Sequence, residues 1–124
     1  MQILLIDDDK NLCHLTRIAL TKHGFDLAVA HEAATGIKQA QQDKPSLILM
    51  DVMLPDISGA EAVRFLKSDP QLKDIPVVFL TGLISSGEKG IQEGGLKVDG
   101  LNYLTLGKPF EIEDLIEAVR KYAK

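Results

Sequence analysis

The sequence predicts an α/β fold, a doubly wound five-stranded parallel sheet with helices on both faces. Five short, continuous apolar runs occur along the 124 residues, as expected of strands that are buried on both sides. Segments with helical hydrophobic periodicity separate these runs. This alternation is typical of right-handed strand–helix–strand crossovers, and it therefore favours a sheet covered by helices on both faces.

The five apolar runs define the predicted strands, which are residues 3–6, 27–30, 47–50, 77–80 and 101–104. We expect them in the flavodoxin-like order 2-1-3-4-5. In a sheet of this kind, ligands bind beyond the carboxyl ends of the strands. The residues that directly follow each run are therefore the first place to look for a site.

Four helices are predicted, over residues 11–22, 33–42, 59–67 and 112–123. The inward face of the first helix is predicted from its apolar positions, which are Leu12, Leu15, Ile18 and Ala19. The inward face of the last helix is predicted in the same way, from Ile112, Leu115, Ile116, Val119 and Tyr122. The second and third helices bury Ile37 and Ala40, and Ala62, Val63 and Leu66, respectively.

Glycine is concentrated in one part of the chain. Seven of the ten glycines are Gly82, Gly87, Gly90, Gly94, Gly95, Gly100 and Gly107. Glycine weakens helices, so the chain between the fourth strand and the end of the fifth is poor helix material. We expect an irregular region there, with at most a short helix.

Composition limits the class of protein. The length and the 45% hydrophobic content predict one globular domain, residues 1–124. A net charge of −4 argues against a direct nucleic-acid partner, which would need clustered cationic side chains. The single cysteine, Cys13, excludes an internal disulfide, and neither a signal peptide nor a membrane-spanning run is recognisable. We therefore expect a cytoplasmic protein without a membrane anchor.

Polar residues capable of chemistry follow four of the predicted strands. Asp7, Asp8 and Asp9 follow the first, Asp51 the third, Thr81 the fourth and Lys108 the fifth. Clustered carboxylates require a compensating cation, and Mg²⁺ prefers such oxygen ligands. A metal ion, an ammonium group and a hydroxyl can neutralise phosphoryl oxygens while a carboxylate attacks phosphorus. The pattern thus indicates phosphoryl transfer, although Asp9 alone is better explained as a cap of the first helix.

Four stretches of the chain resemble the receiver domains of two-component response regulators. They are Leu4-Leu5-Ile6-Asp7-Asp8-Asp9, Leu49-Met50-Asp51-Val52-Met53-Leu54-Pro55-Asp56-Ile57-Ser58-Gly59, Leu80-Thr81-Gly82 and Lys108-Pro109-Phe110. The resemblance spans nearly the whole chain, and the set of four is far more specific than any one of them.

The resemblance implies a role for each matching residue. Asp51 matches the phosphoacceptor, Thr81 the switch hydroxyl and Lys108 the lysine that pairs with the phosphoryl group. Asp7, Asp8, Asp51 and the backbone carbonyl of Met53 match the Mg²⁺ site. The implied function is a phosphoacceptor switch, not a turnover enzyme. Its implied partners are a sensor histidine kinase or phosphotransfer protein, and a target protein or an output domain.

The chain departs from the family at two positions near the switch. Gly82 follows the switch threonine, and Thr105 occupies the place of the switch aromatic, three residues before Lys108. Tyr103 shares a strand face with Thr105, because strand side chains alternate. It is equally explained as a switch aromatic or as a tyrosine packed at a strand end.

Other interpretations remain open for the same residues. In a haloacid-dehalogenase-like phosphatase, Asp7 would be the nucleophile and Asp9 the acid, but Asp51 would have no role. A flavodoxin-like binding module or a degenerate receiver that acts only as an interaction surface are further alternatives. The histidines and Cys13 show no metal-ligand spacing and are expected to have no special role. Residues 56–59 are expected to form a turn that caps the third helix.

Overall fold

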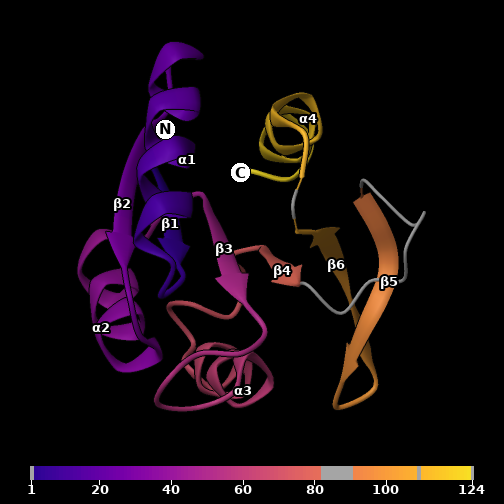
Figure 1. The fold of residues 1–124 in the computed structure, drawn as a ribbon. Coiled ribbons are helices and arrows are strands. Elements are labelled where there is room, and N and C mark those ends of the chain that lie inside the picture. The colour runs from indigo at the N-terminus through magenta and orange to yellow at the C-terminus, as the bar shows by residue number, and fades with distance from the viewer. Residues whose placement is uncertain (1, 82–90, 109, 124) are drawn as a thin grey trace.

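Strands and helices alternate through most of the chain (Figure 1). The computed structural model describes residues 2–81, 91–108 and 110–123, and for residues 91–95 the backbone only. Within them the elements are β1 (Gln2–Ile6), α1 (Lys10–Lys22), β2 (Asp26–Ala30), α2 (Ala33–Asp43), β3 (Leu47–Asp51), α3 (Gly59–Ser68), β4 (Val77–Thr81), β5 (Ile91–Val98), β6 (Leu101–Gly107) and α4 (Ile112–Tyr122). No helix in the described residues has the length and apolar character needed to cross a bilayer.

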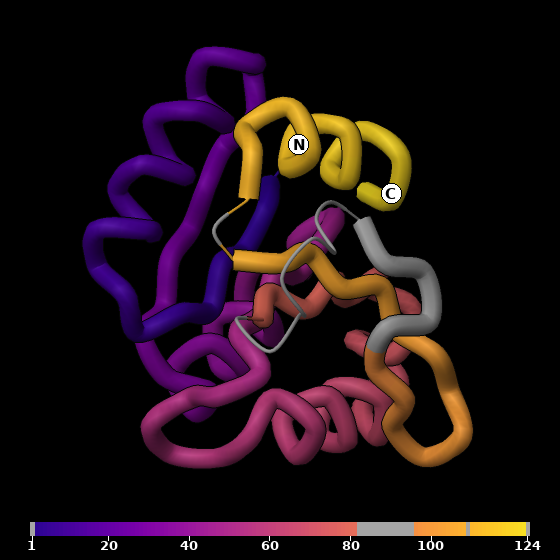
Figure 2. Tube along the Cα trace, turned by 45° about the vertical axis from the view of Figure 1, so that its right-hand side comes forward, coloured from indigo at the N-terminus to yellow at the C-terminus, as the bar shows by residue number. Residues whose placement is uncertain are grey.

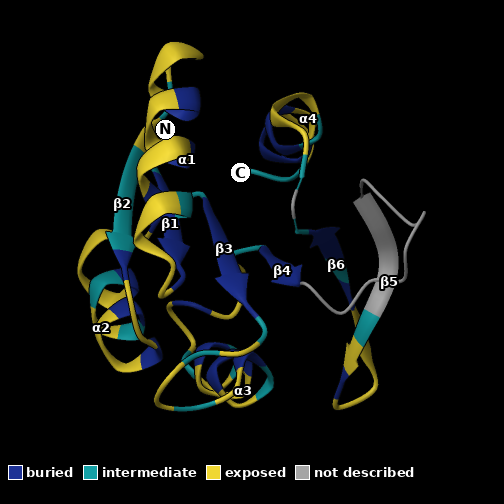
Figure 3. Ribbon diagram, viewed as in Figure 1, coloured by how far each residue is buried: buried dark blue, intermediate teal, exposed yellow. Residues whose placement is uncertain are grey.

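The described strands form one sheet in the order β2-β1-β3-β4-β6-β5. The first five strands in this list are mutually parallel, and their order confirms the predicted flavodoxin-like arrangement, with β6 as the fifth parallel strand. Side chains of β1, β3 and β4 are almost completely buried (Figure 3), which explains why these strands appear in the sequence as continuous apolar runs.

The prediction of five strands was wrong, because the sheet has a sixth, β5, which pairs with β6 in the antiparallel direction. The two strands are joined by Asp99 and Gly100, both with positive φ, 51° and 82°. This conformation fits a type I′ hairpin turn, for which Asp-Gly is a preferred pair. The glycine-rich segment thus forms a strand over residues 91–98, whose pairing with β6 shifts in register between residues 92 and 96. Residues 82–90 lie outside the described part of the chain.

The sheet separates two apolar clusters. On one face, α1 and α4 contribute Cys13, Leu20, Leu115 and Val119 to the first cluster. On the other, α2 and α3 contribute Ala40, Ala62, Val63 and Leu66 to the second. Figure 1 shows these helix pairs on opposite sides of the row of strands. Each helix pair therefore covers one face of the sheet.

The predicted inward face of α1 was wrong for two residues, since Leu15 and Ile18 are exposed. The buried residues of this helix are Cys13, Thr16, Ala19 and Leu20. These side chains are mostly small, so they allow α1 to lie close to the sheet. The pattern of large apolar residues therefore placed the inward face of the helix about one residue away from the face that is buried. In α4, Ile112 is likewise 39% exposed, whereas Leu115, Ile116 and Val119 are buried as predicted.

The turn between β5 and β6 lies near α3, as the tube in Figure 2 shows. Arg64 Nε of α3 lies 3.0 Å from Asp99 Oδ2 in the turn. Inside this contact, the Tyr103 ring packs edge-on against Phe79, with ring centroids 5.5 Å apart. The hairpin therefore contacts α3 through its turn and β4 through Tyr103.

Candidate functional site

The register of the parallel strands brings the predicted site residues to one edge of the sheet. Ile6 of β1 is opposite Met50 of β3, so Asp7 and Asp51, which come next, are neighbours. Thr81 at the end of β4 is opposite Gly107 of β6. The Lys108 N–H then donates to the Thr81 carbonyl, 2.8 Å away, which places Lys108 beside the carboxylates.

Three carboxylates form the centre of this edge. Asp7, Asp8 and Asp51 each offer an oxygen, and these three oxygens lie within 4.8 Å of one another. Asp7 is fully buried and Asp51 is 9% exposed, whereas Asp8 faces solvent. Three negative charges this close favour a cation between them.

Lys108 supplies one positive charge to the cluster. Its Nζ lies 2.6 Å from Asp7 Oδ2 and 3.3 Å from Asp51 Oδ2. Burial by itself would lower the pKa of Lys108, but the ion pairs with Asp7 and Asp51 outweigh burial and raise it. The ammonium group is therefore charged at neutral pH, yet one charge does not neutralise three carboxylates.

Asp51 has a raised pKa, mainly because burial removes solvent from its charged form. The neighbouring charge of Asp7 adds to this increase, whereas the Met53 N–H and Lys108 oppose it. A carboxylate with a raised pKa destabilises the folded state above its usual pKa. A divalent cation at this edge would relieve that cost, and three oxygen donors with an open, exposed side suit Mg²⁺.

The loop after β3 holds Met53 over Asp51. The Met53 N–H donates to Asp51 Oδ1 at 3.2 Å, while the Met53 side chain is 68% exposed. Only the backbone of Met53 therefore faces the site. Gly59 permits the return of the chain, because a Cβ at this position would lie 2.8 Å from the Asp51 backbone oxygen.

Asp9 caps α1, as expected, through Oδ1, which accepts the Leu12 N–H at 3.1 Å. Its carboxylate is therefore not one of the cluster. Cys13 is buried below, and burial together with Asp7 and Asp9 raises the pKa of its thiol to about 11. A thiol with this pKa is almost entirely protonated at neutral pH and is a poor nucleophile.

Two residues near the site make contacts that the sequence did not predict. His31, expected to have no special role, is exposed, and its Nδ1 lies 3.0 Å from the Asp7 backbone oxygen. The segment 56–59 caps α3 as expected, because the Ser58 hydroxyl accepts the Glu61 N–H, but Asp56 in the same segment caps α2, a contact that was not predicted. The sequence did indicate that the cap of α2 comes from elsewhere in the chain. The helix begins after Glu32, and Glu is not among the residues preferred as helix caps.

Tyr103 is packed inside the fold, with only 8% of its surface exposed. It shares a face with the buried Thr105, as the alternation of strand side chains predicted, and Lys67 Nζ lies 6.0 Å from its ring centroid.

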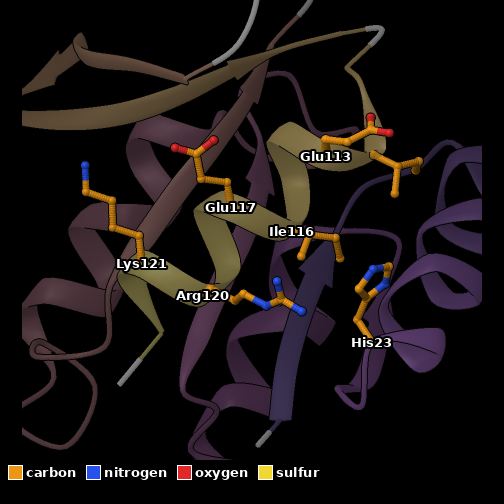
Figure 4. Close-up of a pocket in the computed structure, with 7 residues that line it drawn as sticks. His23, Glu113, Ile116, Glu117, Arg120 and Lys121 are labelled. Carbon is orange, nitrogen blue, oxygen red and sulfur yellow. The ribbon is translucent and has the colours of Figure 1, made fainter.

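A surface pocket of about 540 Å³ lies away from the acidic edge, between α4 and the end of α1 (Figure 4). It is lined by side chains of both charges and by two isoleucines, namely His23, Ile112, Glu113, Ile116, Glu117, Arg120 and Lys121. None of the predicted site residues lines it. The chemistry is therefore expected at the acidic edge and not in this pocket.

Comparison with known proteins identifies the class to which this fold and site belong. The sequence profile of the response regulator receiver domain matches residues 3–120. The chain therefore belongs to the receiver domain family of two-component response regulators. This finding confirms the resemblance inferred from the four motifs, and nothing in the comparisons supports the phosphatase alternative.

Relatives in the same family differ in length. The uncharacterized transcriptional regulatory protein YkoG of Bacillus subtilis is 35% identical over 119 residues, which are 95% of this chain and 49% of YkoG. The DNA-binding dual master transcriptional regulator RpaA of Synechocystis is 38% identical, over 96% of this chain and 47% of RpaA. The chain thus spans about half the length of these relatives. The polar-differentiation response regulator DivK of Brucella anthropi is 28% identical, over 97% of this chain and 94% of DivK.

Solved structures agree with the fold. A sensor protein from Polaromonas sp. JS666 superposes with a TM-score of 0.82 at 27% identity, covering 98% of this chain and 94% of that one. The chemotaxis response regulator CheY4 of Vibrio cholerae gives a TM-score of 0.78 at 22% identity, over 98% and 97% of the two chains, and shows the fold alone.

Proposed function

We propose that this chain is a phosphoacceptor switch in which Asp51 receives a phosphoryl group from a histidine kinase in a Mg²⁺-dependent reaction. The observation that carries the proposal is the meeting of Asp7, Asp8, Asp51 and Lys108 at one edge of the sheet. An attacking carboxylate, oxygen ligands for a metal and a fixed ammonium group are the groups that phosphoryl transfer requires.

Asp51 is the nucleophile in this scheme. One of its carboxylate oxygens forms a bond to phosphorus while the bond from phosphorus to the donor imidazole nitrogen breaks. The electron pair of that bond stays on the imidazole, which leaves as the neutral ring because its other nitrogen carries a proton. Because Asp51 is anionic and so is the donor, the approach requires positive charge on the phosphoryl oxygens.

Positive charge and hydrogen bonds come from the residues around Asp51. Asp7, Asp8, Asp51 and the Met53 carbonyl would hold Mg²⁺, which, when bound, neutralises charge on the phosphoryl oxygens. Lys108 pairs with Asp51 now and would pair with the phosphoryl group afterwards, and Thr81, buried at the end of β4, would donate its hydroxyl. Their movement towards the phosphoryl group would change the surface formed by β4, β6 and the β5–β6 hairpin.

The proposed role includes its partners and location. The phosphodonor is a sensor histidine kinase or a phosphotransfer protein, and the output is a target protein or another domain. The chain accepts one phosphoryl group and loses it by hydrolysis, so it is not a conventional turnover enzyme. We place it in the cytoplasm without direct contact to nucleic acid or membrane, in keeping with its net charge of −4 and its single, buried cysteine.

Incubation with acetyl phosphate tests this proposal without a kinase. We expect the intact mass to increase by one phosphoryl group when Mg²⁺ is present, and to stay unchanged when a chelator removes the metal. Restoring Mg²⁺ to the chelated sample should restore the uptake. Equal uptake with and without Mg²⁺, or none in either sample, would contradict the proposal.

A further inference from the structure

The loop between β3 and α3 carries Met53 and is fixed at its base. The Gly59 N–H donates to the Val52 carbonyl at 2.7 Å, and Met53 and Ser58 form an isolated antiparallel bridge. The Val52 N–H donates to the Leu80 carbonyl at 3.1 Å and the Met53 N–H donates to Asp51 Oδ1 at 3.2 Å, so the first residues of the loop are held at the acidic edge. The outer part of the loop makes a further contact, at Asp56.

Asp56 joins this loop to α2, more than twenty residues earlier in the chain. Its Oδ1 accepts the Ala33 N–H and its Oδ2 accepts the Ala34 N–H, both at 2.9 Å. The preceding residue, Glu32, makes no side-chain capping bond, and the first turn of α2 contains no acidic residue. The carboxylate of Asp56 therefore supplies the cap and the negative charge that the start of this helix lacks.

The protonation state of the Asp56 carboxyl agrees with this contact. Burial by itself would raise the pKa of the Asp56 carboxyl, but hydrogen bonds from the backbone N–H groups of Ala33 and Ala34, and then of Ile57 and Asp56 itself, together outweigh burial and lower it. The carboxylate is consequently charged throughout the neutral range. Charged acceptors make shorter and stronger hydrogen bonds than neutral ones, so this link is firmer than an ordinary loop contact.

The start of α2 is connected to the acidic cluster on its other side. His31, two residues before Ala33, has Nδ1 3.0 Å from the Asp7 backbone oxygen, and the Asp7 N–H donates to the Ala30 carbonyl at 3.0 Å. A continuous path of contacts therefore runs from Asp51 through Met53, Asp56 and the start of α2 to Asp7. Both ends of this path are members of the carboxylate cluster.

We propose that Asp56 is a positioning residue for the metal and phosphoryl site, which ties the loop bearing Met53 to α2 and so fixes the Met53 carbonyl relative to Asp7 and Asp51. The inference rests on the proposed Mg²⁺ site. Asp56 does not touch the metal in this scheme, and it acts through the loop.

Two substitutions of Asp56 separate the effect of its hydrogen bonds from the effect of its charge. Asp56→Ala removes both hydrogen bonds, and we expect the dissociation constant for Mg²⁺ to rise about tenfold, as at groups that orient metal ligands. Asp56→Asn removes the same charge but keeps one oxygen acceptor, so we expect a clearly smaller rise. Asp69→Ala is the matched control, because Asp69 also accepts a backbone N–H, from Gln71 at 2.9 Å, but lies at the other end of α3. Its Mg²⁺ affinity should equal that of the wild type.

The measurements are Mg²⁺ titration followed by NMR, with melting temperatures to confirm folding, and amide exchange of the metal-free proteins. In Asp56→Ala the Met53 amide should exchange faster than in the wild type, while in Asp69→Ala it should not. Unchanged exchange at Met53 in Asp56→Ala would overturn the inference. Absence of Mg²⁺ binding by the wild type would instead count against the proposed function, and the exchange measurement would still test the role of Asp56. Equal loss of affinity in Asp56→Asn and Asp56→Ala would assign the effect to charge and overturn it as well.

Discussion

Replacing Asp8 with asparagine is expected to weaken Mg²⁺ binding by more than about tenfold, because it removes the exposed carboxylate among the three proposed ligands. Asp7 and Asp51 are both paired with Lys108, whereas Asp8 makes no ion pair among the described residues. Its oxygens are thus the most available for a metal ion. Titration with Mg²⁺ by calorimetry or NMR measures the loss.

Asp9→Asn provides the matched control for Asp8→Asn. It removes the same charge one residue away, but the Asp9 carboxylate caps α1 and is not in the cluster. We therefore expect Mg²⁺ affinity close to that of the wild type, with the free energy of unfolding lowered by at most about 1 kcal/mol. Equal losses of Mg²⁺ affinity in the two variants would contradict the division of roles and would favour the phosphatase-like use of Asp7 and Asp9.

Replacing Lys108 with methionine is expected to destabilise the metal-free protein by about 3 kcal/mol, because it leaves the buried Asp7 carboxylate without its cation. The pKa of Lys108 is raised in the folded state, so the ion pair contributes its full stability below the usual pKa of lysine. That contribution is lost only as the pH rises through the higher, folded-state pKa. The loss in the variant should therefore be nearly constant across the neutral range.

Urea denaturation in the presence of a chelator measures this effect, and Lys22→Met is the control, because Lys22 is an exposed lysine in the last turn of α1. Adding Mg²⁺ should restore part of the stability of Lys108→Met, since a bound divalent cation replaces the missing charge beside Asp7 and Asp51. A loss no greater than that of Lys22→Met would show that the ion pair does not stabilise the buried carboxylates.

The parallel part of the sheet and the acidic edge could be predicted from the sequence for the same reason. Strands buried on both faces leave continuous apolar runs, and parallel strands bring their carboxyl ends together. Asp7, Asp51 and Thr81 each directly follow such a run, and Lys108 follows the last run four residues on, directly after the end of β6. Their proximity therefore needed no knowledge of the loops between them.

Three features depended on information that hydrophobic patterning does not carry. The β5–β6 hairpin follows from the local geometry of Asp99 and Gly100, while glycine content alone indicated only a weak helix. The face of α1 depends on how closely small residues such as Cys13 approach the sheet. The link from Asp56 to α2 joins loops over twenty residues apart, and only the tertiary structure brings them together.

The position of the phosphoryl group tests the central claim most directly. After incubation with acetyl phosphate and Mg²⁺, borohydride reduction converts an aspartyl phosphate into homoserine, and peptide mass spectrometry then locates the changed residue. The proposed function predicts homoserine at position 51, in the peptide that also contains Met53. Homoserine at position 7, with Asp51 unchanged, would contradict it and would identify Asp7 as the nucleophile.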